Sequence, residues 1–169
     1  MKIAKNMLWA VALGLSLAGV QAGEWGNWRG PNHNGSTEEK DLPAKFSKTQ
    51  GVIWSAPMPG PSAATPIVFG DHVFVSSSNP EEQQLMASCH DRKTGALKWK
   101  HVVARGHNKD NRSNYAAPSP VTDGQLVSFY YGNGALATYT TDGKKMWAKN
   151  IEKEHGEFAY QWTPSSSPL

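Results

Sequence analysis

Residues 89–99 read CHDRKTGALKW, and residues 137–147 read ATYTTDGKKMW, a segment of similar character. Both segments end in a tryptophan, and an earlier tryptophan extends the series, so that Trp54, Trp99 and Trp147 recur at intervals of 45 and 48 residues. A period of about 20 to 50 residues is typical of proteins built from stacked copies of one small unit. The sequence therefore predicts a repeat architecture.

Each repeat is predicted to contain four β-strands. Short apolar runs are separated by Asp-Gly, Asn-Gly or Thr-Gly, which is the pattern of strands linked by hairpins. Four-stranded units of this length around a common axis are blades of a β-propeller. An array of β-sandwich domains is the alternative, but each sandwich needs about 100 residues. The predicted strands are residues 65–69, 72–76, 84–90 and 96–103 in the first repeat and 120–122, 125–131, 135–140 and 144–151 in the second.

The predicted fold class is all-β, and a second repeated feature marks the blade boundaries. Thr65-Pro66, Ser119-Pro120 and Ser167-Pro168 each pair a hydroxyl residue with proline. Because a propeller has about four to eight blades, the chain is predicted to be part of a longer protein. The predicted division is an N-terminal extension over 23–50, a lone outer strand over 51–62 that closes the ring, blade 1 over 63–115, blade 2 over 116–162 and the start of blade 3 over 163–169.

Residues 1–22 have the pattern of a secretory signal peptide. Lys2 and Lys5 precede an apolar run over residues 7–19, and the small residues that follow predict cleavage after Ala22. As a helix this run would rise about 20 Å, less than the ~30 Å hydrocarbon layer of a bilayer. The mature chain is therefore expected to be secreted or periplasmic, with no membrane span after cleavage.

The composition excludes several classes of site. The chain has one cysteine, Cys89, which excludes a disulfide framework and a thiolate zinc site within it. The formal net charge is +3 and falls to +1 without Lys2 and Lys5 of the predicted leader. Nucleic-acid binding depends on clustered Lys and Arg, so nucleic acid is not an expected partner.

The repeated segment also has a mechanical interpretation. Asp91 is placed to accept hydrogen bonds from the amides of a turn, and Gly95 allows a tight reversal of the chain. Trp99 then projects an indole with about 200 Å² of surface toward the neighbouring blade. The residues predicted to dock successive blades are Trp54, Asp91, Thr94, Gly95, Trp99, Asp142, Gly143 and Trp147.

These segments resemble the tryptophan-docking repeat of pyrroloquinoline-quinone-like (PQQ-like) β-propellers, and Trp28-Arg29-Gly30-Pro31 resembles the start of secreted propellers of that superfamily. Counted back from each tryptophan, the first copy departs from the repeat by Cys89 in place of alanine. The second departs by Tyr139 and Asp142 in place of aspartate and threonine. The resemblance covers residues 24–169 and implies four-stranded blades docked by tryptophan.

The resemblance allows three functions, and the residues of this chain do not distinguish between them. Superfamily members include a scaffold for outer-membrane protein assembly, quinone-dependent dehydrogenases and many secreted proteins of undetermined role. We expect an exported binding or scaffold module that contacts a ligand or a protein. The alternative is a PQQ-dependent dehydrogenase of alcohols or sugars. The third is an extracellular polysaccharide-binding protein that uses exposed aromatic residues such as Tyr115 and Trp162.

Catalytic and metal-binding residues are not assigned within the chain. The dehydrogenases of the superfamily carry a pair of adjacent cysteines and a calcium site near the axis, and no adjacent cysteines occur here. PQQ and calcium are therefore expected only if further blades carry their ligands.

Candidate contact residues lie in the loops that follow each blade, at residues 104–117 and 152–163. Loops held by a rigid scaffold often carry function, and these two are expected on the usual ligand-binding face of a propeller. The alternative is that each loop is only a solvated connector. His72, His90 and His101 are expected to be ordinary strand histidines and Cys89 a small buried residue. The candidates are Arg105, His107, Arg112, Tyr115, His155, Tyr160 and Trp162.

Overall fold

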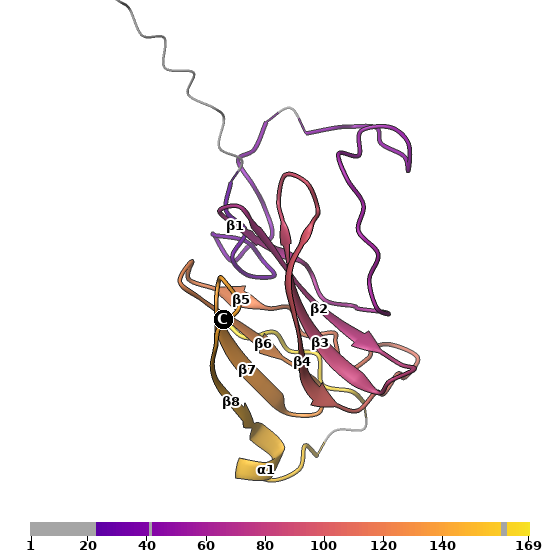
Figure 1. Cartoon of the computed structure of the whole chain (residues 1–169), viewed down its shortest axis with the longest axis vertical. Coiled ribbons are helices and arrows are strands. Elements are labelled where there is room, and N and C mark those ends of the chain that lie inside the picture. The colour runs from indigo at the N-terminus through magenta and orange to yellow at the C-terminus, as the bar shows by residue number, and fades with distance from the viewer. Residues whose placement is uncertain (1–22, 41, 160–161) are drawn as a thin grey trace, which may run out of the picture.

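The computed structural model describes residues 23–40, 42–159 and 162–169, so the predicted signal peptide and Tyr160 lie outside the described residues. Two four-stranded antiparallel sheets follow one another, each with its strands in chain order (Figure 1). The first contains β1 (Ile67–Phe69), β2 (His72–Asn79), β3 (Gln84–Asp91) and β4 (Leu97–Arg105). The second contains β5 (Val121–Thr122), β6 (Leu126–Tyr130), β7 (Ala135–Thr140) and β8 (Lys145–Asn150), followed by the short helix α1 (Ile151–His155).

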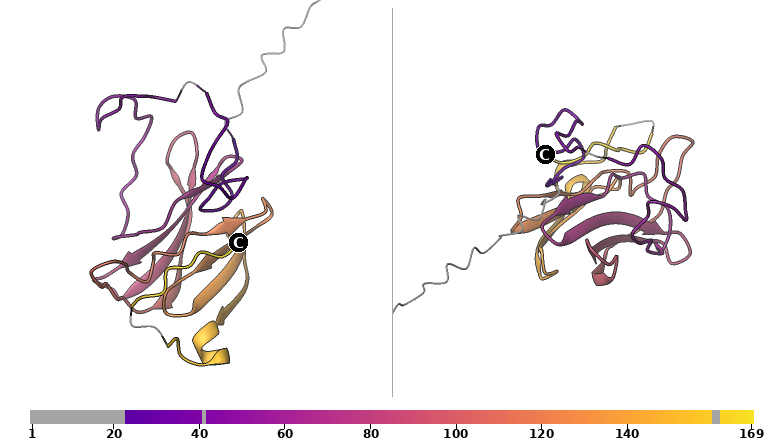
Figure 2. Two further views of the ribbon diagram at one scale, coloured as in Figure 1. Left: turned by 180° about the vertical axis from the view of Figure 1, so that it is seen from behind. Right: turned by 90° about the horizontal axis from the view of Figure 1, so that it is seen from above.

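The two sheets are blades of a partial β-propeller. Within each sheet, every strand pairs with the next one along the chain. Strand β1 contacts β5, and β4 contacts β7, so the sheets stack with their first strands adjacent, as Figures 1 and 2 show. The predicted all-β fold with four-stranded antiparallel blades is confirmed.

The hydrophobic core lies between the two blades. Because side chains alternate between the faces of a strand, every second residue of β3, β6 and β7 is directed at the facing blade. Cys89 is one of these buried residues, and burial raises the pKa of its thiol to about 12. The core residues are Ile67, Phe74, Leu85, Ala87 and Cys89 from the first blade, Ala116 from the connecting loop, and Val127, Phe129, Tyr131, Ala135, Ala137 and Tyr139 from the second.

Three expected elements differ in the structure. Residues 51–62 are not a strand, because they form no ladder of backbone hydrogen bonds with any strand in the described part of the chain. In those residues one backbone hydrogen bond is formed, from the Ser78 N–H to the Pro61 carbonyl at 3.1 Å. Residues 163–169 likewise contain no strand. Ile151, predicted to end the last strand, begins α1, where the Asn150 side chain caps the first turn.

The N-terminal extension crosses from one blade to the other, which was not predicted. Trp25 exchanges two backbone hydrogen bonds with Val68 of β1, at 2.8 and 3.0 Å. The carbonyl of Gly26 accepts the N–H of Thr122 in β5 at 2.9 Å. Residues 25–30, called the N-terminal bridge below, therefore tie together the first strands of both blades.

None of the helices in the described residues is long and apolar enough to cross a membrane.

Candidate functional site

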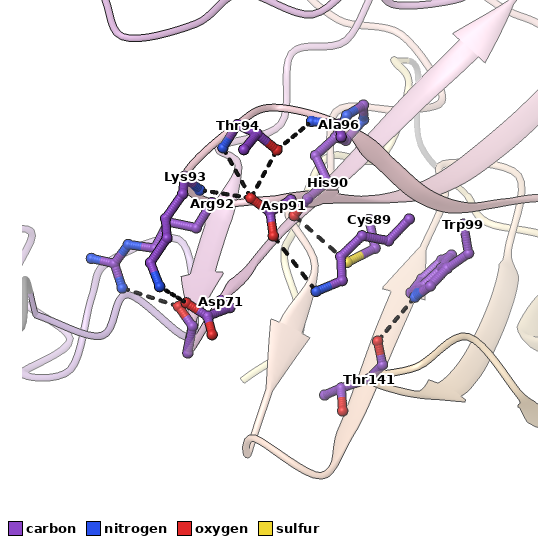
Figure 3. A network of polar contacts seen from close by, with 12 residues as sticks. Asp71, Cys89, His90, Asp91, Arg92, Lys93, Thr94, Ala96, Trp99 and Thr141 are labelled. Carbon is purple, nitrogen blue, oxygen red and sulfur yellow. Dashed lines mark hydrogen bonds and ion pairs between the residues drawn. The ribbon is translucent and has the colours of Figure 1, made fainter.

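The indole of Trp99 joins the two blades. Its Nε1 donates to the carbonyl of Thr141 in the β7–β8 turn at 2.9 Å (Figure 3). The ring lies against Gly143 of the same turn, where a Cβ atom would stand 2.7 Å from Trp99 Cγ. Gly143 also has a φ of 95°, which L side chains rarely adopt. Both the space and the backbone conformation therefore require glycine at this position.

Trp54 makes the same contact with the β3–β4 turn. Its Nε1 donates to the carbonyl of Arg92 at 2.8 Å. A Cβ atom on Gly95 would lie 2.5 Å from Trp54 Cε3, and the φ of Gly95 is 74°. Trp54 reaches this position although its segment forms no strand, so the contact depends on the turn that it covers.

Asp91 organises the β3–β4 turn (Figure 3). Its Oδ1 accepts the N–H groups of Lys93 and Thr94 at 3.1 and 2.9 Å and the Thr94 hydroxyl at 2.9 Å. These bonds, with the Thr94 hydroxyl as the largest contribution, lower the pKa of Asp91. The carboxylate therefore holds in place the turn that receives Trp54.

The β7–β8 turn is one residue shorter, which corrects the alignment drawn from the sequence. Leu97 pairs with His90, and Lys145 pairs with Tyr139, so Tyr139 corresponds to His90 and not to Asp91. The residue in the place of Asp91 is Thr140.

The hydroxyl and the carboxylate have exchanged places between the two turns. In the β3–β4 turn the Thr94 hydroxyl donates to Asp91, whereas in the β7–β8 turn the Thr140 hydroxyl donates to Asp142. The Thr140 hydroxyl is also the largest of the contacts that lower the pKa of Asp142. Each turn therefore keeps one carboxylate and one hydroxyl, in opposite order along the chain.

His101 takes part in the contact between the blades, a role that the sequence did not predict. Its ring stacks on Tyr139 with centroids 4.8 Å apart and planes 2° from parallel. Its Nε2 lies 2.8 Å from the Gly143 carbonyl. The available signal was its position two residues after Trp99, because residues i and i+2 of a strand share one face. Trp147, the third docking candidate, is 43% exposed and pairs with Thr138 on β7.

The loops that follow the two blades are tied together by Asp110. Its Oδ1 accepts the N–H groups of Arg112 and Ser113, both at 2.7 Å, and its Oδ2 accepts the N–H of Thr163 at 3.0 Å. These bonds, led by the one from Thr163, hold the pKa of Asp110 well below its usual range. Asn108 adds a second link, because its Nδ2 donates to the Thr163 hydroxyl at 3.2 Å.

The first of these loops also contacts the hairpins of both blades. The N–H of Gly106 donates to the Gln83 carbonyl in the β2–β3 hairpin at 2.8 Å, and the N–H of Gly132 in the β6–β7 hairpin donates to the Tyr115 carbonyl at 2.8 Å. The loops and these hairpins therefore lie on one side of the blades, called the loop face below.

The hydroxyl-proline repeats form a row of hydrogen bonds at the start of each blade. The hydroxyl of Ser119 accepts the N–H of Thr65 at 2.8 Å, and the hydroxyl of Ser167 accepts the N–H of Ser119 at 2.9 Å. Each unit thus donates its amide to the hydroxyl of the next. The repeated Ser or Thr before proline was visible in the sequence, but the amide that each hydroxyl accepts was not.

Two hollows are both lined by Asp110 and Thr163. The smaller, of about 260 Å³, is lined by residues that include Tyr115, Glu152 and Phe158. Both hollows also contain Trp162, which is 59% exposed. The larger hollow, of about 660 Å³, is lined by Trp28, Ala63, Thr65, Asp110, Arg112, Ser113, Ala117, Ser119, Trp162, Thr163, Ser165, Ser166 and Ser167.

The structure brings only some of the candidate loop residues together. Arg112 and Trp162 share the larger hollow, and Tyr115 and Trp162 share the smaller. Arg105 lies apart, in a hollow with Asn133 and Glu152. The two candidate histidines differ: His155 is exposed and lies 4.0 Å from Glu154, whereas His107 is half-buried, and its Nδ1 has no hydrogen-bond partner in the described residues.

The described residues do not fit a calcium and quinone site. Calcium takes about six to eight oxygen ligands, and no group of three or more His, Cys, Asp or Glu side chains is placed to hold a metal within residues 23–40, 42–159 and 162–169. Asp110 is the one carboxylate lining the larger hollow, and three backbone N–H groups already occupy its oxygens. Buried Cys89 is the sole cysteine of the chain.

Comparison with known proteins identifies the family of the repeat. The family model described as outer membrane protein assembly factor BamB matches residues 36–165. BamB from Moraxella catarrhalis is similar in structure with a TM-score of 0.43 and 20% identity, over 58% of this chain and 26% of that one. A europium-containing methanol dehydrogenase gives a TM-score of 0.37 and 18% identity, over 50% of this chain and 15% of that one. The search of curated proteins found no match.

This chain therefore spans about a quarter or less of the length of these two solved structures. The family model covers most of the described residues, including both docking turns and both loops. The chain belongs to the family of PQQ-like β-propeller repeat proteins represented by outer membrane protein assembly factor BamB.

Proposed function

We propose that this protein is an exported binding or scaffold module whose contact surface is the loop face. The observation that carries the proposal is the bond from the Thr163 N–H to Asp110, which joins loops that follow two different blades. Around this bond lie two hollows lined by exposed aromatic side chains and by Arg112. Export rests on the sequence pattern of residues 1–22.

The hydrogen bonds of Asp110 support this proposal because they limit the motion of both loops. A surface that is already ordered loses less conformational entropy when it binds a partner. Loops positioned by a rigid scaffold are also where binding residues are found most often.

A photo-crosslinking experiment in the producing cells tests the proposal. A benzophenone side chain is placed at Arg112 on the loop face and, as the matched control, at exposed Lys145 on β8. Discrete crosslinked products are expected from position 112 and not from position 145. Equal products at both positions, or none at position 112, would contradict the proposal.

A second measurement separates this function from that of a quinone enzyme. The purified protein is titrated with PQQ and Ca²⁺ while its absorption spectrum is recorded. A binding or scaffold module needs no bound quinone, so we expect no saturable change. A saturable quinone band would overturn the scaffold interpretation in favour of a dehydrogenase.

A further inference from the structure

We propose that the larger hollow binds a carbohydrate chain, with Trp28 and Trp162 as stacking platforms for sugar rings. The inference rests on the proposed function, because it names the class of ligand for the same loop face. Trp28 comes from the N-terminal bridge and Trp162 from the loop after blade 2, yet both line one hollow of about 660 Å³. Ligand pockets of proteins are typically about 300 to 1,000 Å³.

Both indoles are partly exposed to solvent, although large aromatic side chains are usually mostly buried. Trp28 is 44% exposed and Trp162 is 59% exposed. An indole is a broad apolar surface, and a sugar ring presents an apolar face of C–H groups that matches it. The remaining edge of a sugar ring carries hydroxyl groups, which need polar partners around the platforms.

The platform at Trp28 is held in position by its neighbours. The buried Asn27 side chain accepts the Arg29 N–H at 3.0 Å and donates to the Gly30 carbonyl at 2.9 Å. The guanidinium of Arg29 lies 5.3 Å from the centre of the Trp28 ring, a cation–π contact. The indole therefore needs little reordering to accept a ligand.

The hydroxyl groups of Ser119 and Ser167, called the hydroxyl row below, supply polar partners at fixed positions. A serine hydroxyl has one donor and two acceptor sites, and the row uses one acceptor site of Ser119 and one of Ser167. Both oxygens are therefore held in place, and the half-buried Ser167 hydroxyl can still donate its proton to a ligand, whereas Ser119 is 3% exposed. Thr65, Ser165 and Ser166 add further hydroxyl groups to the same lining.

The charges of the lining favour acidic sugars over neutral ones. Arg112 contributes a guanidinium, which pairs well with carboxylates. The carboxylate of Asp110 remains charged, but three N–H groups occupy its oxygens, so Arg112 is the charged group of the lining that is left to pair with a ligand. One arginine in the lining is not the cluster of cations that a nucleic acid needs. A uronate-containing oligosaccharide should therefore bind more tightly than a neutral one.

Calorimetric titration of the full-length protein with two hexasaccharides, cellohexaose and hexamannuronate, tests the inference. We expect saturable binding with the tighter Kd for hexamannuronate. Trp28→Ala and Trp162→Ala should each raise the Kd by tenfold or more. The matched control is Phe46→Ala, because Phe46 is 74% exposed and lies outside the lining of this hollow, and its Kd should be unchanged.

A further variant tests the charge argument, and thermal melts verify that every variant is folded. Arg112→Gln should weaken binding of hexamannuronate and leave that of cellohexaose unchanged. Trp28→Tyr keeps an aromatic platform and should restore most of the affinity lost in Trp28→Ala. If neither hexasaccharide binds, or if Phe46→Ala weakens binding as much as the tryptophan variants do, the inference is wrong.

The two proposals fail in distinguishable ways. Crosslinked products at position 112 that contain a second polypeptide, together with no hexasaccharide binding, would leave the loop face as a contact surface and overturn the carbohydrate assignment. No crosslinked product and no hexasaccharide binding would overturn both. Hexasaccharide binding that is lost in Trp28→Ala and Trp162→Ala supports both.

Discussion

The hydroxyl of Ser119 accepts the backbone N–H of Thr65 at 2.8 Å, across the boundary between the two blades. The N–H of Ser119 in turn donates to Ser167 at 2.9 Å. The residue that begins each blade thus links it to the next, at the opposite edge of the sheet from the docking tryptophan. Two sets of bonds, inner hydroxyls and outer indoles, hold successive blades together.

Ser119→Ala should destabilise the protein by about 1 to 2 kcal/mol, because it leaves the N–H of Thr65 without an acceptor in a partly buried position. The urea midpoint of unfolding measures this. Ser166→Ala removes an exposed hydroxyl near the same hollow and should leave the midpoint unchanged. Equal midpoints for Ser119→Ala and Ser166→Ala would show that the hydroxyl row adds no stability.

Gly143→Ala should lower the free energy of unfolding by about 2 to 3 kcal/mol. This is more than the ~1 to 2 kcal/mol expected from placing a side chain on a left-handed backbone alone. The added methyl group would stand 2.7 Å from Trp99 Cγ and push the indole away. Gly35→Ala is the control, because Gly35 has a φ of 77° but nothing within 4 Å of the added Cβ. Tryptophan fluorescence should shift to the red in Gly143→Ala only, and a shift of the same size in both would refute this.

Trp99→Ala should lower the free energy of unfolding by about 3 to 5 kcal/mol, because a large side chain is lost from the contact between the blades. Trp99→Phe keeps a ring against Gly143 but removes the Nε1 donor to Thr141. That variant should lose about 1 kcal/mol, the low end of the ~1 to 3 kcal/mol expected when a buried carbonyl loses its donor, because this bond is only partly buried. Chemical denaturation of the three proteins gives both values, and an unchanged midpoint for Trp99→Ala would rule out the docking role.

The bonds that lower the pKa of Asp110 make part of the stability depend on pH. The folded-state pKa lies below the value of about 4 expected in the unfolded chain. The contribution is therefore present above about pH 4 and is lost as the pH falls through the folded-state value. Asp110→Asn lacks this dependence, so the difference in urea midpoint between the two proteins should shrink as the pH is lowered from about 6 to 3. A difference that stays constant over this range would contradict the prediction.

The docking contacts show how much of the site could be predicted. The tryptophan period and the turn glycines at 95 and 143 were visible in the sequence, but their pairing was not, because Trp54 meets Gly95 and Trp99 meets Gly143 only through the stacking of successive units. The counterpart of Asp91 was misplaced, because counting back from Trp147 assumed two turns of equal length. The β7–β8 turn is one residue shorter, and only strand pairing shows that Thr140 opens it.

The sequence predicted which loops carry candidate contact residues, but not which of those residues lie close together. Arg112, Tyr115 and Trp162 were identified from their loops, whereas Trp28 and the hydroxyl row were not connected with them. Trp28 and Trp162 are far apart along the chain, and no local pattern indicates that they share a hollow.

The eight strands of the two blades and the glycines of their turns follow from local sequence patterns, because alternation of side chains and the conformational freedom of glycine act between residues close together in the chain. The tertiary structure decided which amide meets which hydroxyl and which loops share Asp110. Those bonds form between groups 48 to 54 residues apart, and their partners are set by how the two sheets stack.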